Sequence, residues 1–417
     1  MDSIQIQGEV KLQGKVRIQG SKNAALPILA ATLLTRDVSY LRNCPKIADV
    51  YGMLEMLECL GCSVLREEAG IRVDTSKLRG GILSKRACGK MRSSLCMLGA
   101  MLGSIHEARL DYPGGCVIGS RPIDFHIDAL KKMGVRFLEK EKGLYAFASN
   151  LHGADITLKF PSVGATENII LAAVLAKGNT IIRNAAMEPE VVSLCDYLKQ
   201  SGADIVGAGK KEIIIRGVDR LTGTDYTIPS DRIVAGTYLF ATVGCGGEVY
   251  LENAPVKQME APICLAKQMG AHCLTLDNGI FLTATGTVNI PDFVMTEPYP
   301  GFPTDLQSVA LASMTRGKGQ GIIEENIFEN RFRILEELNK LGTKVKQLDE
   351  KHVKVYGVER LNGNRLKADE LRGGAALVVA GLMSKGTTVI SGCEYIQRGY
   401  ENICRDLREL GARIASG

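Results

Sequence analysis

The sequence feature that most constrains the fold is a short phrase, occurring six times, in which an amphipathic helix ends at a glycine and an apolar strand begins. The six copies read LECLGCSV, LKKMGVRF, LKQSGADI, AKQMGAHC, LNKLGTKV and LRELGARI. Their glycines lie 68 to 73 residues apart by subtraction and are Gly61, Gly134, Gly202, Gly270, Gly342 and Gly411. Glycine in this context is typical of a left-handed residue just after a helix. The constant period predicts six copies of one supersecondary unit.

A second repeated pattern is a strand followed by a small apolar helix. The helices read NAALPILAATLL, RSSLCMLGAML, TENIILAAVLAKG, RIVAGTYLFATV, DLQSVALASM and RGGAALVVAGLMSKG. Their alanines and glycines predict close packing in a crowded interior. A further strand and loop then lead into the amphipathic helix that ends at the next glycine. Each repeat therefore contains two helices and about four strands, and six repeats predict two pseudo-threefold α/β domains.

The boundaries of these domains follow from the strands that precede the first small helix. The segment EVKLQGKVRIQG is displaced from the rest of its repeat, so we assign residues 1–20 together with 231–417 to the second domain. Residues 21–230 form the first domain, which carries the loop of Cys116. Ligands commonly bind between domains, and we expect the active site in the interdomain cleft.

Composition excludes several classes of function for this chain of 417 residues. The net charge of +5 is mild and no block of like charges occurs, so nucleic-acid binding is not expected. The amino terminus alternates like a strand and has no apolar h-region, so we expect no signal peptide. Apolar runs such as ALVVAGLM are too short to span a membrane. Twelve cysteines without a disulfide framework favour a reducing, cytoplasmic location. Five dispersed histidines without an HExxH motif predict no metal site.

Charged residues recur at or beside the starts of the small helices. They are Lys22, Arg92, Glu167, Arg232, Asp305 and Arg372. Four of the six are cations, which the helix dipole disfavours at this end. One interpretation is that an anion is bound there by backbone N–H groups and side chains together. The alternative is that each charged side chain points into solvent.

Cations also recur at the junctions between loops and amphipathic helices. They are Lys46, Arg121, Arg331 and Arg398. No GxxxxGK[ST] loop occurs, and no GxGxxG follows a strand and opens a helix. A custom cluster of arginine and lysine is therefore expected to hold a multiply charged anion, such as one with phosphate and carboxylate groups. The planar guanidinium can bind either group through two hydrogen bonds.

The stretch DYPGGCVIGSRPIDFHI places Cys116 in a glycine-rich loop, five residues before Arg121. A thiol donates a proton when neutral and attacks as thiolate, so a functional thiol needs a pKa near the working pH. A nearby cation lowers a thiol pKa, and glycines would let such a loop close over a substrate. The alternative is an incidental surface cysteine. Asp305 after GFPT also has a structural alternative, which is that of a helix N-cap.

Several motifs together resemble one family, the UDP-N-acetylglucosamine 1-carboxyvinyltransferases. They are GSKNAALPILAATLL, PGGCVIGSRPIDFHI, SVGATENIILAA, NAAMEPEVV, GFPTDLQ, IFENRF and RGYE. The resemblance covers the whole chain. It implies two similar inverse α/β barrel domains, each of three βαβαββ repeats, the enolpyruvyl transferase fold.

The resemblance also implies a reaction. The enolpyruvyl group of phosphoenolpyruvate is transferred to the 3′-hydroxyl of UDP-N-acetylglucosamine by addition and elimination, and phosphate is released. This is the first committed step of peptidoglycan synthesis. We expect these two small molecules as the partners, no cofactor, no nucleic acid, no membrane contact, and a cytoplasmic monomer.

The family's functional residues map onto matching positions of this chain. Cys116 matches the proton donor that forms an adduct with phosphoenolpyruvate and is alkylated by fosfomycin, and Asp305 matches the carboxylate that takes the sugar hydroxyl proton; Lys22 completes the catalytic set. Phosphoenolpyruvate-binding positions are Lys22, Asn23, Arg92, Arg121, Arg331, Arg372 and Arg398. UDP-N-acetylglucosamine-binding positions are Asn23, Arg92, Arg121, Pro122, Ile123, Asp124, Phe125, Lys159, Ser162, Val163, Gly164, Asp305 and Ile327.

Two other functions compete with this interpretation. The sister enzyme that uses shikimate 3-phosphate shares the fold, but the Cys116 loop, the uridine segment and the absence of a GNAGT signature argue against it. A non-catalytic sugar-nucleotide sensor could keep the scaffold. Such a protein should have lost Cys116, Asp305 or a key cation, and the sequence retains all of them.

Overall fold

The computed structural model describes residues 3–83, 92–111, 123–140 and 143–417. Cys116, Arg121 and Pro122 lie outside the described residues. None of the helices in the described part of the chain has the length and apolar character needed to cross a membrane.

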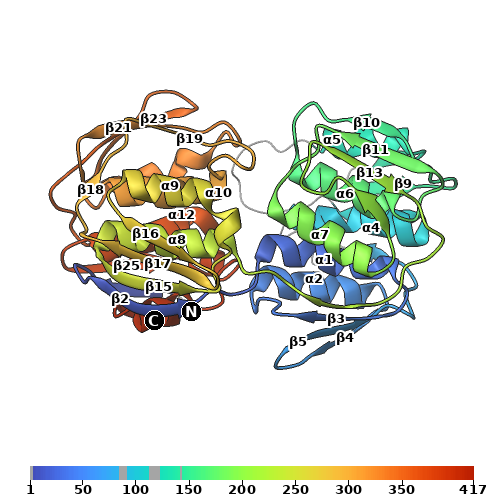
Figure 1. Cartoon of the computed structure of the whole chain (residues 1–417), viewed down its shortest axis with the longest axis horizontal. Coiled ribbons are helices and arrows are strands. Elements are labelled where there is room, and N and C mark those ends of the chain that lie inside the picture. The colour runs from blue at the N-terminus through green and yellow to red at the C-terminus, as the bar shows by residue number, and fades with distance from the viewer. Residues whose placement is uncertain (1–2, 84–91, 112–122, 141–142) are drawn as a thin grey trace. The chain divides into compact units, whose positions relative to one another are not determined.

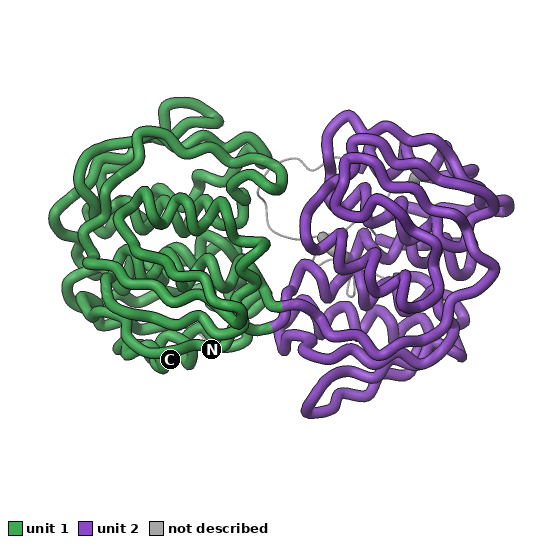
Figure 2. The backbone as a smooth tube through the Cα atoms, viewed as in Figure 1, with its two compact units in different colours: residues 1–19, 117–120, 230–417 green, residues 20–116, 121–229 purple. Residues whose placement is uncertain are grey.

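The chain forms two compact units (Figures 1 and 2). One contains residues 3–19 and 230–417, and we call it the terminal unit because both chain ends belong to it. The other contains the described residues between Gly20 and Pro229, and we call it the inserted unit. Each unit has its own hydrophobic core.

The described residues of the inserted unit form three four-stranded sheets with one common order. The orders are β14-β3-β5-β4, β6-β7-β9-β8 and β10-β11-β13-β12. In each sheet the first two strands are parallel and the remaining pairs are antiparallel. The strands are β3 (Val38–Arg42), β4 (Ser63–Arg66), β5 (Gly70–Asp74), β6 (Ile82–Leu83), β7 (Glu107–Asp111), β8 (Arg136–Lys140), β9 (Gly143–Phe147), β10 (Asp155–Thr157), β11 (Asn179–Arg183), β12 (Asp204–Val206), β13 (Glu212–Arg216) and β14 (Asp225–Thr227).

The helices of the inserted unit alternate between small apolar and amphipathic ones. The small helices are α1 (Lys22–Ala31), α4 (Cys96–Ile105) and α6 (Val163–Ala173). The amphipathic helices are α2 (Ala48–Cys59), α5 (Asp124–Lys132) and α7 (Pro189–Gln200), and the 3-10 turns are η1 (Thr32–Leu34) and η2 (Arg92–Leu95).

The terminal unit repeats this arrangement. Its four-stranded sheets have the orders β16-β17-β15-β2, β19-β21-β23-β22 and β24-β25-β1-β26, and β18 pairs with β20. The strands are β1 (Ser3–Gln7), β2 (Leu12–Arg17), β15 (Gly247–Glu252), β16 (His272–Leu276), β17 (Gly279–Ala284), β18 (Val288–Asn289), β19 (Phe293–Met295), β20 (Gly317–Lys318), β21 (Gln320–Glu324), β22 (Lys344–Gln347), β23 (His352–Tyr356), β24 (Arg365–Lys367), β25 (Thr387–Ser391) and β26 (Arg413–Ser416).

The small helices of the terminal unit are α8 (Arg232–Cys245), α10 (Thr304–Met314) and α12 (Leu371–Met383). The outer helical segments are η3 (Val256–Gln258), α9 (Glu260–Gln268), η4 (Arg331–Ile334), α11 (Leu335–Asn339), α13 (Cys393–Ile396) and α14 (Ile403–Glu409). The amino-terminal strands complete two sheets, since β1 lies between β25 and β26 and β2 pairs with β15.

The six repeat glycines have the conformation that the sequence predicts. Their φ angles are all positive, between 82° and 105°, and a strand begins two residues after each one. Left-handed backbone costs a glycine little, whereas a side chain would be strained there. The predicted helix ends and strand starts are therefore confirmed.

The small helices approach one another so closely that glycine is required at contact points. A Cβ atom at Gly236 of α8 would lie 2.4 Å from the Leu306 side chain of α10, and one at Gly99 of α4 would lie 2.3 Å from the Asn168 carbonyl of α6. Both are far inside van der Waals contact. The predicted crowded interior is confirmed in both units.

Candidate active site

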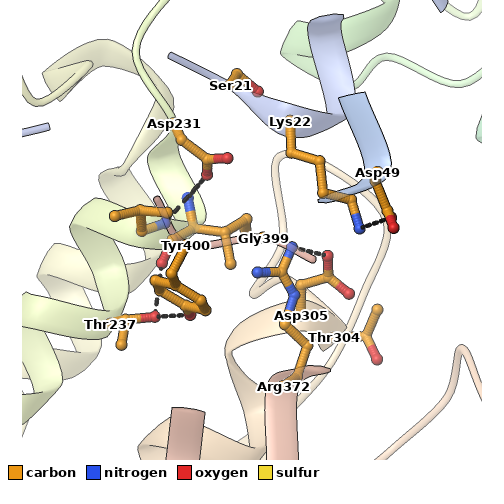
Figure 3. Close-up of polar contacts among 12 residues, drawn as sticks. Ser21, Lys22, Asp49, Asp231, Thr237, Thr304, Asp305, Arg372, Gly399 and Tyr400 are labelled. Carbon is orange, nitrogen blue, oxygen red and sulfur yellow. Dashed lines mark hydrogen bonds and ion pairs between the residues drawn. The ribbon is translucent and has the colours of Figure 1, made fainter. Parts of the chain in front are cut away.

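In the inserted unit, Lys22 is the first residue of α1 and forms a buried ion pair. The Ser21 hydroxyl caps this helix by accepting from the Ala24 N–H at 3.3 Å. Lys22 Nζ lies 3.1 Å from Asp49 Oδ2, with side-chain exposures of 13% and 5% (Figure 3). Asp49 lies in the first turn of α2, where the helix dipole stabilises a carboxylate. The ion pair with Asp49 of α2 therefore fixes the position of the Lys22 ammonium group. Half-buried Asn23 follows Lys22 on α1.

The two predicted uridine segments come together at the starts of α5 and α6. Buried His126 of α5 shares a 3.0 Å hydrogen bond with Asn168 of α6, and the same amide donates to the Gly164 carbonyl at 3.2 Å. A Cβ at Gly164 would lie 3.2 Å from the His126 ring.

This contact links the chain around Ile123, Asp124 and Phe125 to Ser162 and Val163, while Lys159 is exposed in the preceding turn. Sequence analysis missed both His126 and Asn168. Both lie inside motifs quoted above, and the available signal was a polar residue on the buried side of a helix.

The prediction that Glu167 lies at or beside a helix start is wrong. Ser162 caps α6, so Glu167 lies in the second turn, in a buried position. Burial raises the pKa of Glu167 to about 8; the Cys96 thiol, 3.5 Å away, opposes this by hydrogen bonding, and Glu190 and Glu188 add to the rise. Arg92 begins η2, ahead of α4.

In the terminal unit, Asp305 lies between two buried arginines. Asp305 Oδ1 is 2.6 Å from Arg331 Nη2, and Asp305 Oδ2 is 2.8 Å from Arg372 Nη2. The arginine side chains are 2% and 5% exposed and that of Asp305 is 24% exposed. The interpretation of Asp305 as an N-cap is wrong, because α10 begins at Thr304 with Pro303 as its cap. Asp305 therefore lies in the first turn, and its side chain reaches η4 and α12 instead.

Two further carboxylates hold this cluster in place. Thr304 donates to Glu325 at 2.9 and 3.0 Å, and Glu325 accepts from the N–H groups of Ile327 at 2.9 Å and Phe328 at 3.1 Å. Glu370 caps α12 and accepts from the Arg372 N–H at 2.7 Å. Sequence analysis missed Glu325 and Glu370. The position of Glu370 directly before a small helix was the one available signal.

Among the cations of the described residues, Arg372 has the most strongly raised pKa. Burial acts to lower its pKa, but Asp305, Tyr400 and Asp231 together outweigh this effect and the pKa is raised. Burial raises the pKa of the neighbouring Tyr400, which the Arg372 cation opposes. The Tyr400 hydroxyl is 2.8 Å from that of Thr237 (Figure 3).

The remaining predicted cations are placed differently. Arg398 is half-buried in the turn after α13, and Lys46 is exposed before α2. Arg232, the first residue of α8, is buried 5.8 Å from the centre of the Tyr299 ring. The structure therefore brings Asp305, Arg331 and Arg372 into one cluster, and the predicted location of the active site between the domains remains a prediction.

Comparison with known proteins identifies the family. The family model for EPSP synthase (3-phosphoshikimate 1-carboxyvinyltransferase) matches residues 6–407. UDP-N-acetylglucosamine 1-carboxyvinyltransferase 2 of Caldanaerobacter subterraneus subsp. tengcongensis is 42% identical over 99% of both chains. The enzyme named UDP-N-acetylglucosamine 1-carboxyvinyltransferase in Lawsonia intracellularis is 41% identical over 99% of both chains. The chain belongs to the UDP-N-acetylglucosamine 1-carboxyvinyltransferase family.

Solved structures show the same fold. The enolpyruvyl transferase NikO of Streptomyces tendae superposes with a TM-score of 0.90 at 23% identity, covering 99% of this chain and 98% of that one. EPSP synthase of Acinetobacter baumannii gives a TM-score of 0.76 at 18% identity, covering 100% of this chain and 99% of the other. The predicted enolpyruvyl transferase fold, with two inverse α/β barrel domains of three βαβαββ repeats, is confirmed.

Proposed function

We propose that this protein transfers the enolpyruvyl group of phosphoenolpyruvate to the 3′-hydroxyl of UDP-N-acetylglucosamine and releases phosphate. The observation that carries the proposal is full-length identity of about 42% to a carboxyvinyltransferase of this acceptor. The reaction would commit the sugar nucleotide to peptidoglycan and so to cell-wall biogenesis. We propose that it takes place in the cytoplasm and that the enzyme is a monomer, which sedimentation velocity would test.

The proposal assigns roles to the residues of the site. Lys22, Arg331, Arg372 and Arg398, together with Arg92 and Arg121, bind the phosphate and carboxylate of phosphoenolpyruvate. The starts of α5 and α6, joined through His126, bind the uridine. Ile327, whose N–H is held by Glu325, contacts the sugar nucleotide.

The reaction then proceeds by addition and elimination. The sugar hydroxyl attacks C2 of phosphoenolpyruvate while Asp305 takes its proton and Cys116 donates a proton to C3. Phosphate leaves as a proton is removed from C3, which forms the enol ether. Buried guanidinium groups such as Arg331 and Arg372 stabilise the charge that develops on the departing phosphate, since water does not screen them.

Shikimate 3-phosphate is the second candidate acceptor, because the family model that matches most of the chain carries the EPSP synthase description. Phosphate release from phosphoenolpyruvate, measured in parallel with both acceptors, separates the two. We expect release with UDP-N-acetylglucosamine alone. Release with shikimate 3-phosphate alone would overturn the acceptor, and no release from folded protein that binds the sugar nucleotide would favour the sensor.

The role of Cys116 is tested separately with fosfomycin. Cys116→Ala should sharply reduce turnover and abolish covalent inactivation, which intact-mass spectrometry would follow. Cys264→Ala is the matched control, because Cys264 is a free and exposed thiol outside the predicted loop, and it should be inactivated at the wild-type rate. Unchanged inactivation of Cys116→Ala would contradict the assignment.

A further inference from the structure

The two arginines that share Asp305 are held in very different ways. Arg331 is fixed on several sides: its Nε donates to Thr304 Oγ1 at 3.3 Å, its Nη1 lies 3.8 Å from Glu370, and its guanidinium is 5.1 Å from the centre of the Phe328 ring. Arg372 Nη2 donates to Asp305 at 2.8 Å, but Arg372 Nη1 is buried without a hydrogen-bond partner among the described residues. Arg372 also interacts with the Tyr400 side chain, but it has fewer polar contacts than Arg331, so Arg331 is the fixed partner of Asp305 and Arg372 is the more exchangeable one.

A buried guanidinium nitrogen without an acceptor is costly, and such groups normally have partners. The missing acceptor at Arg372 Nη1 therefore indicates a ligand oxygen. Phosphate and carboxylate groups are bound most strongly when two nitrogens of one guanidinium contact two of their oxygens. Nη2 is the second nitrogen that would complete this grip, and it is already bonded to Asp305. Nη2 carries a second N–H group, but an oxyanion bound there would lie beside the Asp305 carboxylate, and the two like charges would repel each other. An oxyanion and Asp305 therefore compete for Arg372.

We propose that the oxyanion of phosphoenolpyruvate displaces Asp305 from Arg372. This exchange releases one Asp305 oxygen from Arg372, and that oxygen then takes the proton of the sugar hydroxyl. The inference rests on the proposed function, in which Asp305 is the base. Arg331 keeps Oδ1 and so keeps the carboxylate oriented, while Oδ2 is released from Arg372. The hydroxyl O–H bond breaks and an O–H bond forms on the ionised carboxylate. The base is thus activated only after the anion has bound.

The competition predicts an effect that a simple base would not show. Asp305→Asn should bind inorganic phosphate more tightly than the wild type, by about fivefold, because coupled binding steps influence each other reciprocally and commonly by at least this factor. The same variant should lose kcat while its KM for phosphoenolpyruvate falls. Calorimetric titration with inorganic phosphate measures the affinity, and thermal melting establishes that the variant is folded. If Asp305→Asn is poorly folded, Asp305→Ser removes the same charge and should show the same tightening.

Matched variants separate competition from a general loss of negative charge. Asp369→Asn removes an exposed carboxylate of the same unit, which pairs with Arg333 at 3.3 Å, and should leave the affinity unchanged. In an Arg372→Lys background, where no planar fork exists, Asp305→Asn should no longer tighten binding. The inference fails if Asp305→Asn binds phosphate equally or more weakly, or if the tightening persists with Arg372→Lys.

The outcome for this inference is distinguishable from that for the proposed function. Phosphate release by the wild-type protein with UDP-N-acetylglucosamine tests the reaction and does not depend on Asp305 variants. If the wild type is active and Asp305→Asn has unchanged phosphate affinity, the exchange at Arg372 is contradicted and the proposed function stands. If the wild type is inactive, the proposed function is contradicted, and with it the role of Asp305 as base, whatever the titrations show.

Discussion

The two units place a charged pair at the same point of the repeat, with opposite polarity. In the inserted unit the small helix supplies the cation Lys22 and the outer helix supplies Asp49. In the terminal unit the small helix supplies the anion Asp305, and Arg331 comes from the outer segment. The backbone of the repeat brings the two positions together in both units, and the side chains alone decide the sign.

The pairs also differ in what they leave available. The ammonium of Lys22 has three N–H donors, and its pair with Asp49 is a single contact at 3.1 Å, so we expect Asp49 to position the cation without excluding an anion. Asp305 occupies a nitrogen of Arg372 that a bidentate grip needs. The comparison therefore leads us to expect that Asp49 supports anion binding by Lys22, whereas Asp305 competes with anion binding by Arg372. The variants below test whether this difference is real.

The largest effect is expected at Arg331. Arg331→Met removes a cation that contacts Asp305 and Glu370. It leaves Arg372 to balance Asp305, and Glu370 with its backbone N–H donors. Removing one partner of a buried pair costs about 3–5 kcal/mol, and turnover should be lost. Urea unfolding measures the stability. Arg333→Met, which removes an exposed arginine, should cost under about 1 kcal/mol; equal losses for both variants would show that the cluster is not special.

An intermediate effect is expected at Asp49. Asp49→Asn should weaken phosphoenolpyruvate binding and lower kcat/KM about 100-fold, a loss typical of small misplacements of a catalytic group, because Lys22 loses its fixed position. This is opposite to the tightening expected for Asp305→Asn. Steady-state kinetics would be compared with Asp196→Asn, whose exposed pair with Lys199 is dispensable. Tighter binding by Asp49→Asn would erase the distinction between the two units.

The smallest effect concerns two buried carboxylates of one repeat, Glu167 in the second turn of α6 and Glu190 in the first turn of α7. Glu167 and Glu190 are both buried, and burial, together with repulsion from Glu190 and Glu188, raises the pKa of Glu167 to about 8. A raised pKa contributes stability that is present below the unfolded value of about 4.3 and is lost as pH rises through the folded value.

Glu167→Gln should therefore melt a few degrees above the wild type at pH 9, and the difference should shrink as the pH falls below the folded pKa. Glu55→Gln is the control, because Glu55 is exposed on α2. A difference that does not depend on pH would show that ionisation of Glu167 is not its cause. Differential scanning fluorimetry across this pH range is sufficient.

The sequence by itself determined the repeat. The six glycines define helix ends because only a residue without a side chain adopts their φ angles cheaply. The alanine-rich helices are interior ones because larger side chains could not fit between their axes. Both are local consequences of residue type, so they could be predicted for residues such as Gly61 or Gly236 without knowing their partners.

Only the tertiary structure decided which charges meet. Asp305 and Arg372 are 67 residues apart, and the contact depends on how α10 and α12 pack and on where α10 begins. Because the cap of α10 is Pro303, two residues before Asp305, the side chain that could have capped the helix lies between two arginines instead. A cap at Ser162 likewise placed Glu167 in the buried second turn. His126 and Asn168 likewise meet only because α5 and α6 are neighbours. Residue type sets local conformation, whereas the pairing of distant charges follows from packing that no single segment encodes.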